Sequence, residues 1–163
     1  MEFEQADSIN RLIKALSMRH RARAAALLAE LNLHPGQEVL LLELAQHGPR
    51  TQVQLAHGAG CEPPSITLMV RKLEAGGLVS RSPSPTDGRA TIVELTEAGR
   101  ALVPRLQRAW QSLAEETTAD HPLPPEELLQ VIWPMVEALG GVPDLTGCPT
   151  HAAPPVDGAA ARR

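Results

Sequence analysis

Two stretches in the middle of the chain place hydroxyl, apolar and basic side chains at spacings that suit contacts with a polyanion. In the first stretch, four apolar residues at helical period predict the core side of a helix: Ile66, Met69, Val70 and Leu73. The other side of that helix presents Pro64, Ser65, Thr67, Leu68, Arg71 and Lys72. Hydroxyl groups bond phosphates or base edges, leucine can contact a thymine methyl group, and arginine can reach guanine or phosphate. Taken alone, this side fits the solvated face of an ordinary helix equally well.

The second stretch is a turn in which Asp87 and Arg89 flank Gly88. In a tight hairpin these two side chains can meet, so that Asp87 holds the guanidinium of Arg89 extended. An extended arginine suits a narrow minor groove, where the potential of DNA is most negative. Arg81, in the strand before the turn, adds a further basic group. The alternative is an exposed ion pair of little consequence, but the basic helix just upstream favours contact with DNA.

Helical periodicity predicts two helices before these stretches and a short third helix that leads into them. A long amphipathic helix is expected over residues 5–31, and a second helix is expected to open at 34–36 and to stop at 48–49. The predicted core positions of the second helix are Val39, Leu40, Leu42, Leu44 and Ala45. Thr51 and Gln54 have the spacing of a capping box and predict the start of the third helix. We therefore expect these two side chains to support a helix-turn-helix.

The pattern then changes from helical to extended and back to helical. Prolines at 63–64 open the fourth helix, whereas residues 78–81 and 91–95 have the composition of two short strands. A further long helix begins at Thr96 and contains Pro104, where we expect a kink. The last helix carries apolar residues at helical steps: Leu128, Leu129, Ile132, Met135, Val136 and Leu139.

This order of elements predicts a mainly α-helical chain with a small β-hairpin wing. A winged helix-turn-helix is expected over residues 35–100, between an N-terminal dimerisation helix at 5–34 and C-terminal dimerisation helices at 101–141. The flanking helices carry more apolar surface than a small domain can cover, which predicts a homodimer. Residues 142–163 show no periodic apolar face and are expected to form a disordered tail.

Residues 36–100 resemble the MarR family of bacterial transcription regulators. The matching stretches are Thr51-Gln-Val-Gln-Leu-Ala, Ser65-Ile-Thr-Leu-Met-Val-Arg-Lys-Leu-Glu, Gly77-Leu-Val-Ser-Arg81, Asp87-Gly-Arg89-Ala and Leu95-Thr-Glu-Ala-Gly-Arg100. The flanking helices extend the resemblance to about residues 5–140. It implies a homodimer on a pseudo-palindromic operator in double-stranded DNA, usually a repressor that a small ligand releases.

Position by position, the resemblance assigns recognition-helix contacts and a wing-tip pair. The matching positions are Pro64, Ser65, Thr67, Arg71, Asp87 and Arg89. Leu68 departs from a position that is often polar or basic in the family, which alters the expected base preference. His34 replaces the usual hydroxyl cap before the second helix, a local change.

The resemblance also implies a cleft for a small anionic aromatic ligand between the dimer helices and the winged helix. Trp110 could form a stacking wall there, and Arg19, His20 or Arg23 could pair with a carboxylate. The alternatives are that Trp110 is a core residue and that the basic run is solvated. Cys61 precedes the basic helix, so its thiol is a candidate redox switch or, alternatively, a small side chain packed in a turn.

Composition and charge exclude several other classes of protein. The sequence has 163 residues and a formal net charge of −4. Only 2% of the residues are aromatic, which excludes a stacking platform for single-stranded nucleic acid, and two cysteines cannot form a disulfide framework. The spacing of the histidines predicts no metal site, no cofactor motif is present, and no motif indicates an enzyme. No apolar run predicts a membrane span or a signal peptide, so a cytoplasmic protein is expected. The remaining alternatives are a winged helix that binds only proteins and a thiol-responsive regulator that acts through Cys61.

Overall fold

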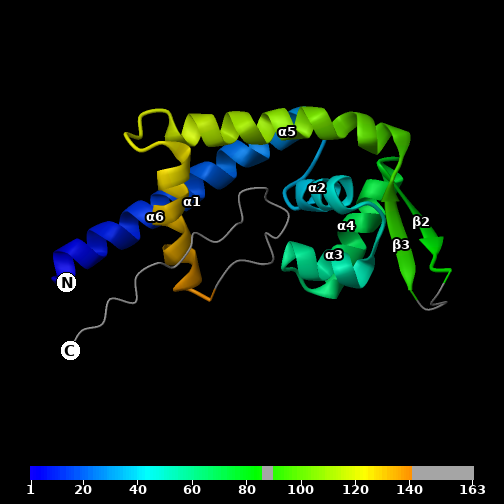
Figure 1. The fold of residues 1–163 in the computed structure, drawn as a ribbon, viewed down its shortest axis with the longest axis horizontal. Helices are drawn as coiled ribbons and strands as arrows, with labels where there is room; N and C mark the ends of the chain where they lie inside the picture. The colour runs from blue at the N-terminus through cyan, green and yellow to red at the C-terminus, as the bar shows by residue number, and fades with distance from the viewer. Residues whose placement is uncertain (86–89, 141–163) are drawn as a thin grey trace.

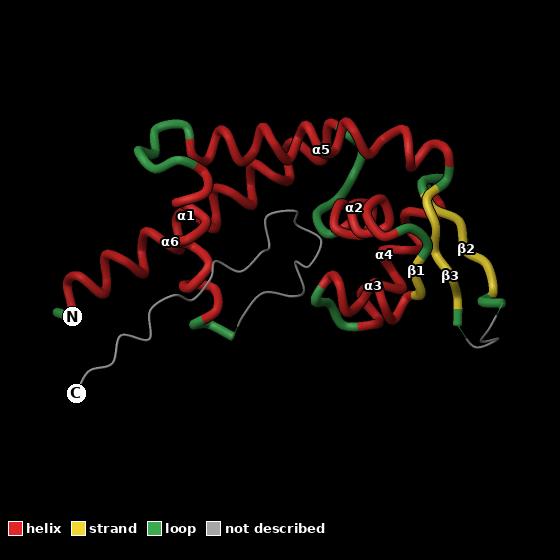
Figure 2. The backbone as a smooth tube through the Cα atoms, viewed as in Figure 1, coloured by secondary structure: helices red, strands yellow, loops and turns green. Residues whose placement is uncertain are grey.

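Within residues 1–85 and 90–140, which the computed structural model describes, the chain forms six helices and three strands. In order they are α1 (Phe3–Glu30), α2 (Gln37–His47), β1 (Arg50–Thr51), α3 (Gln52–Ala59), α4 (Pro63–Ala75), β2 (Val79–Pro83), β3 (Thr91–Leu95), α5 (Glu97–Thr118) and α6 (Pro125–Glu137). Figure 2 shows that helices dominate and that the strands form a small sheet at one end of the molecule. The predicted fold class, mainly helical with a small β wing, is confirmed.

The elements form two groups, one toward each end of the long helix α5 (Figure 1). The amino-terminal half of α5 lies over α2, α3, α4 and the strands, whereas α1 and α6 lie at its other end. α1 packs along α5, and Arg23 on α1 donates from Nε and Nη2 to the two carboxylate oxygens of Glu116 on α5, at 2.6 and 2.7 Å. These hydrogen bonds lower the pKa of Glu116. The pair thus links α1 to α5.

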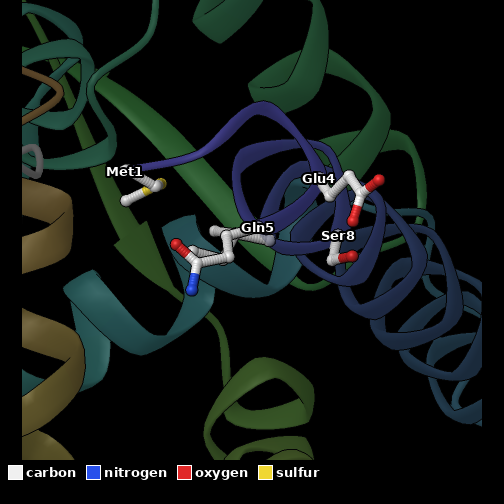
Figure 3. Close-up of a pocket in the computed structure, with 5 residues that line it drawn as sticks. Met1, Glu4, Gln5 and Ser8 are labelled. Atoms are coloured by element: carbon white, nitrogen blue, oxygen red, sulfur yellow. The ribbon is translucent and has the colours of Figure 1, made fainter.

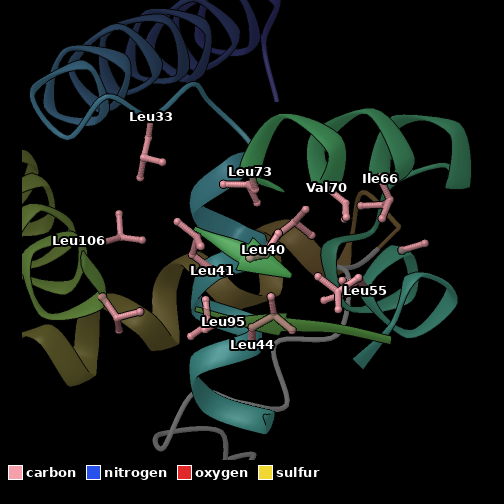
Figure 4. Packing of buried hydrophobic residues seen from close by; sticks show 14 of the residues in the cluster. Leu33, Leu40, Leu41, Leu44, Leu55, Ile66, Val70, Leu73, Leu95 and Leu106 are labelled. Carbon is pink, nitrogen blue, oxygen red and sulfur yellow. The ribbon is translucent and has the colours of Figure 1, made fainter. Parts of the chain in front are cut away.

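The hydrophobic core lies among α2, α3, α4, the sheet and α5 (Figure 4). Aliphatic side chains fill it because the sequence has almost no aromatic residues. The core residues on α2, α3 and α4 are Leu40, Leu41, Leu44, Leu55, Ile66, Val70 and Leu73. β3 contributes Val93 and Leu95, and α5 contributes Val103 and Leu106. The core therefore holds the helix-turn-helix, the hairpin and α5 as one unit.

The sheet has the order β1-β3-β2, and both pairs of strands are antiparallel. β2 and β3 are the two predicted strands, with Val79 opposite Leu95 and Pro83 opposite Thr91. β1 was not predicted, because only two residues, Arg50 and Thr51, pair with β3 more than forty positions along the chain. β1 joins the start of α3 to the hairpin.

A close contact joins the hairpin to α5 and explains the Leu-Thr-x-x-Gly motif. Thr96 caps α5 by accepting from the amide of Gly99 at 3.1 Å, and its hydroxyl donates to the carbonyl of Gly77 at 2.6 Å. A side chain at Gly99 would lie 2.1 Å from the carbonyl oxygen of Leu78. Only glycine fits between the first turn of α5 and the start of β2.

Two local predictions about α2 were wrong. The helix begins at Gln37, not at His34-Pro35-Gly36, because Gly36 takes up a left-handed conformation with φ of 96° just before it. Leu41 is fully buried although it was not among the predicted core positions, whereas Val39 is exposed. The prediction assumed one apolar stripe along the helix, whereas α2 packs against several elements at once and is buried on more than one side.

The other helices begin or end close to their predicted limits. α1 starts two residues before the predicted limit, and α5 continues through Pro104. The predicted tail at 142–163 lies outside the described residues. In the described part of the chain, no helix is both long and apolar enough to cross a membrane.

Candidate nucleic-acid interface

The helix-turn-helix begins with the predicted capping box. The hydroxyl of Thr51 accepts a hydrogen bond from the amide of Gln54 at 3.2 Å, and the side-chain oxygen of Gln54 accepts from the amide of Thr51 at 2.9 Å. α3 ends at Ala59 and is followed by the cap residue Gly60, whose φ of 58° turns the chain toward α4. These local contacts fix the point at which α4 starts.

α4 has one buried side and one exposed side, as its period predicts. Ile66, Val70 and Leu73 are buried in the core, and Met69 packs against it. On the opposite side the exposed residues are Pro64, Ser65, Leu68, Arg71 and Lys72. The core contacts thus fix the rotation of α4 and turn hydroxyl, apolar and basic groups to solvent together.

Thr67 differs from its neighbours because its hydroxyl already has partners within the protein. It lies 3.0 Å from the side-chain oxygen of Gln52 and 3.1 Å from the carbonyl oxygen of Pro63. Gln52, the first residue of α3, was not among the predicted site residues. The link joins residues fifteen positions apart, and no local pattern signals it. Thr67 therefore connects the two helices of the motif.

Arg81, the predicted wing residue that the structure describes, is bound to α4. Its Nε donates to the carboxylate of Glu74 at 2.8 Å, and its Nη2 lies 2.5 Å from the same oxygen. These hydrogen bonds lower the pKa of Glu74. The pair ties β2 to the end of α4, and a contact between Arg81 and nucleic acid stays a prediction. Asp87 and Arg89 lie outside the described residues.

The residues predicted to form an effector cleft come from α1 and α5. Trp110 is half-buried and packs against the core, and Arg23 is bound to Glu116. Arg19 and His20 are exposed on α1. Trp110 thus makes the contacts expected of a core residue, which was the alternative to a stacking wall. The ligand site stays a prediction.

Cys61 lies in the turn between α3 and α4. It is half-buried, packs against the core, and its thiol donates to the carbonyl of Ala59 at 3.4 Å. This is the packing that the simpler interpretation of Cys61 predicts. A thiol switch stays a prediction.

Two hollows open at the surface, away from the exposed side of α4. One, of about 600 Å³, lies on the first turns of α1 and is lined by Met1, Glu4, Gln5, Ser8 and Ile9 (Figure 3). The other, of about 390 Å³, lies between the end of α2, β3 and the start of α5, beside Glu94 and Arg100. Neither hollow includes the predicted effector residues.

Comparisons with known proteins agree with this architecture. The sequence model of the MarR family matches residues 33–91. The HTH-type transcriptional repressor NicR of Pseudomonas putida is 34% identical over 101 residues, which cover 62% of this chain and 64% of NicR. The chain thus spans less than two thirds of the length of the curated relatives it matches.

Two solved structures extend the similarity to the helices at both ends. A probable transcriptional regulator from Pseudomonas aeruginosa has a TM-score of 0.70 at 28% identity, covering 83% of this chain and 98% of that one. The C80S mutant of MarR from E. coli, in complex with operator DNA, has a TM-score of 0.71 at 24% identity, covering 85% of this chain and 99% of that one. At 24% identity, the similarity to MarR from E. coli shows a shared fold alone.

A helix-turn-helix with a basic exposed side, an adjoining β hairpin and long flanking helices defines a winged helix-turn-helix protein with a helical arm. The winged helix-turn-helix of this chain, over residues 33–91, matches the MarR family, and the flanking helices share the fold of MarR from E. coli.

Proposed function

We propose that this protein is a sequence-specific transcription regulator, a homodimeric repressor that binds a pseudo-palindromic operator in double-stranded DNA. In this proposal α4 enters the major groove and the hairpin approaches the minor groove. The observation that carries it is the exposed side of α4, where Ser65, Arg71 and Lys72 face solvent from a helix whose other side is fixed in the core. In this proposal the protein is not an enzyme: it regulates transcription by binding DNA. It lies in the bacterial cytoplasm, where the chromosomal DNA is.

The uncovered apolar side chains of α1 and α6 support the homodimer. α6 has no buried residue, and its Leu129, Val131, Ile132 and Met135 are exposed. Leu12, Ile13 and Leu16 on α1 are exposed as well. Exposed apolar side chains in this number are characteristic of an interface. A second copy of the same chain covers both helices and places two recognition helices on one side of the DNA.

The test is DNA binding by the full chain and by the variant Arg71→Ala. Duplexes are selected from a random pool, and affinity is measured by fluorescence anisotropy over a range of salt concentrations. We expect the wild type to select a two-fold symmetric sequence. Arg71→Ala should weaken binding to it by about 1–3 kcal/mol and, if Arg71 contacts a base, should relax specificity at one position.

Arg108→Ala is the matched control, because Arg108 is an exposed arginine on α5. It removes the same charge and should leave the selected sequence unchanged. If no duplex is enriched, or if Arg71→Ala binds the selected duplex with full affinity, the proposal fails. A winged helix that binds only proteins would then be favoured.

A further inference from the structure

The exposed side of α4 has an apolar centre. Pro64 and Leu68 lie one turn apart on that side, and 55% of the surface of Leu68 is exposed. Ile66 and Val70, on either side of Leu68 in sequence, are completely buried. The core thus fixes the rotation of α4 without any contribution from Leu68, whose side chain faces away from it.

The groups around Leu68 narrow down what it can contact. Arg71 follows three residues later on the same side and is exposed. Thr67, the polar neighbour before it, has its hydroxyl next to Gln52 and the carbonyl of Pro63. The middle of this side therefore offers an aliphatic surface, and its neighbours three residues away on either side are the exposed hydroxyl of Ser65 and the guanidinium group of Arg71.

In the major groove, thymine is the base that carries a methyl group, at C5, and aliphatic side chains contact it. Residues three apart on a helix are separated by about 4.5 Å along its axis, whereas base pairs are spaced about 3.4 Å apart. A base contacted by Leu68 and a base or phosphate contacted by Arg71 would thus lie within one or two base pairs of each other.

We propose that Leu68, with Pro64 behind it, is a specificity-determining residue that selects a thymine in each half-site through its methyl group. The inference rests on the proposed function, because it requires α4 to lie in the major groove. It adds the chemical feature of the operator that this chain recognises.

The test replaces single thymines by uracil, which removes the methyl group and leaves the base pairing unchanged. Each thymine of the duplex selected by the wild type is replaced in turn, and affinity is measured by fluorescence anisotropy. Replacing the contacted thymine in one half-site should weaken binding about fourfold. Replacing it in both half-sites should weaken binding roughly fifteenfold. Leu68→Ala should bind the thymine and uracil duplexes equally well.

Val53→Ala is the matched control, because Val53 is an exposed apolar residue on α3 that also loses methyl groups on truncation. It should retain the full sensitivity to uracil. The inference is overturned if no thymine methyl group contributes, if Leu68→Ala keeps the wild-type sensitivity, or if Val53→Ala loses it. Operator selection that succeeds alongside any of these outcomes leaves the proposed function standing, whereas failed selection contradicts both.

Discussion

Glu38, at the start of α2, is a carboxyl group that the fold buries. Only 8% of its surface is exposed, and in the described part of the chain its Oε2 has no hydrogen-bond partner. Burial raises the pKa of Glu38, although the backbone amides of Glu38 and Gly36 act in the opposite direction. The charged form is therefore less stable in the folded chain than in the unfolded one.

This burial predicts a pH-dependent stability. Because the folded-state pKa of Glu38 lies above its unfolded value, about 4.3, its contribution to stability is fully present below that value. The contribution is lost as the pH rises through the folded-state pKa. Glu38→Gln removes the ionisation, so it should raise the free energy of unfolding at pH 7 relative to its effect at pH 4.

Denaturant unfolding followed by circular dichroism at the two pH values measures this difference. Glu115→Gln, an exposed carboxyl on α5, is the control and should show no such difference. An equal effect of Glu38→Gln at both pH values would contradict the prediction.

At the scale of elements, the junction between β2 and α5 leaves no room for a side chain at Gly99. A Cβ atom there would lie 2.1 Å from the carbonyl oxygen of Leu78, so backbone must shift. Gly99→Ala should lower the free energy of unfolding by about 3 kcal/mol. Gly76→Ala is the matched control, because its Cβ would meet only ordinary contacts at 3.5 Å and its φ of −79° suits alanine.

Urea denaturation curves of both variants measure the difference. Gly76→Ala should stay within about 1 kcal/mol of the wild type. Similar losses in the two variants would show that the contact at Gly99 does not determine stability. A selective loss would establish that the glycine of the Leu-Thr-x-x-Gly motif serves to join the hairpin to α5.

The elements were largely predictable from the sequence, whereas most of the contacts between them were not. The capping box at Thr51 and the two sides of α4 depend on neighbours within four residues, so periodicity and spacing reveal them. β1, the link between Gln52 and Thr67 and the pair of Glu74 with Arg81 depend on which segments meet in space. The fold thus showed that the hydroxyl of Thr67 and the guanidinium of Arg81, both predicted as contacts to DNA, have partners within the protein.

At the scale of the whole molecule, α6 lies at the end of α5 away from the winged helix (Figure 1), and none of its residues is buried. Ile132 is 45% exposed and Met135 57% exposed, so neither contributes much to packing within the chain. If a second copy covers this surface, an acidic residue there would lie buried and unpaired in the interface. Ile132→Asp and Met135→Asp should each weaken the dimer by several kcal/mol and leave the helix content nearly unchanged.

Sedimentation velocity across a range of micromolar concentrations measures the change from dimer to monomer, and circular dichroism verifies folding. Leu68→Asp is the matched control, because Leu68 is comparably exposed but lies on α4. It should stay dimeric while losing affinity for DNA. The two α6 variants should also lose affinity for a two-half-site duplex, because two separate monomers no longer bind as one unit. An α6 variant that remains a dimer would show that this surface serves another purpose.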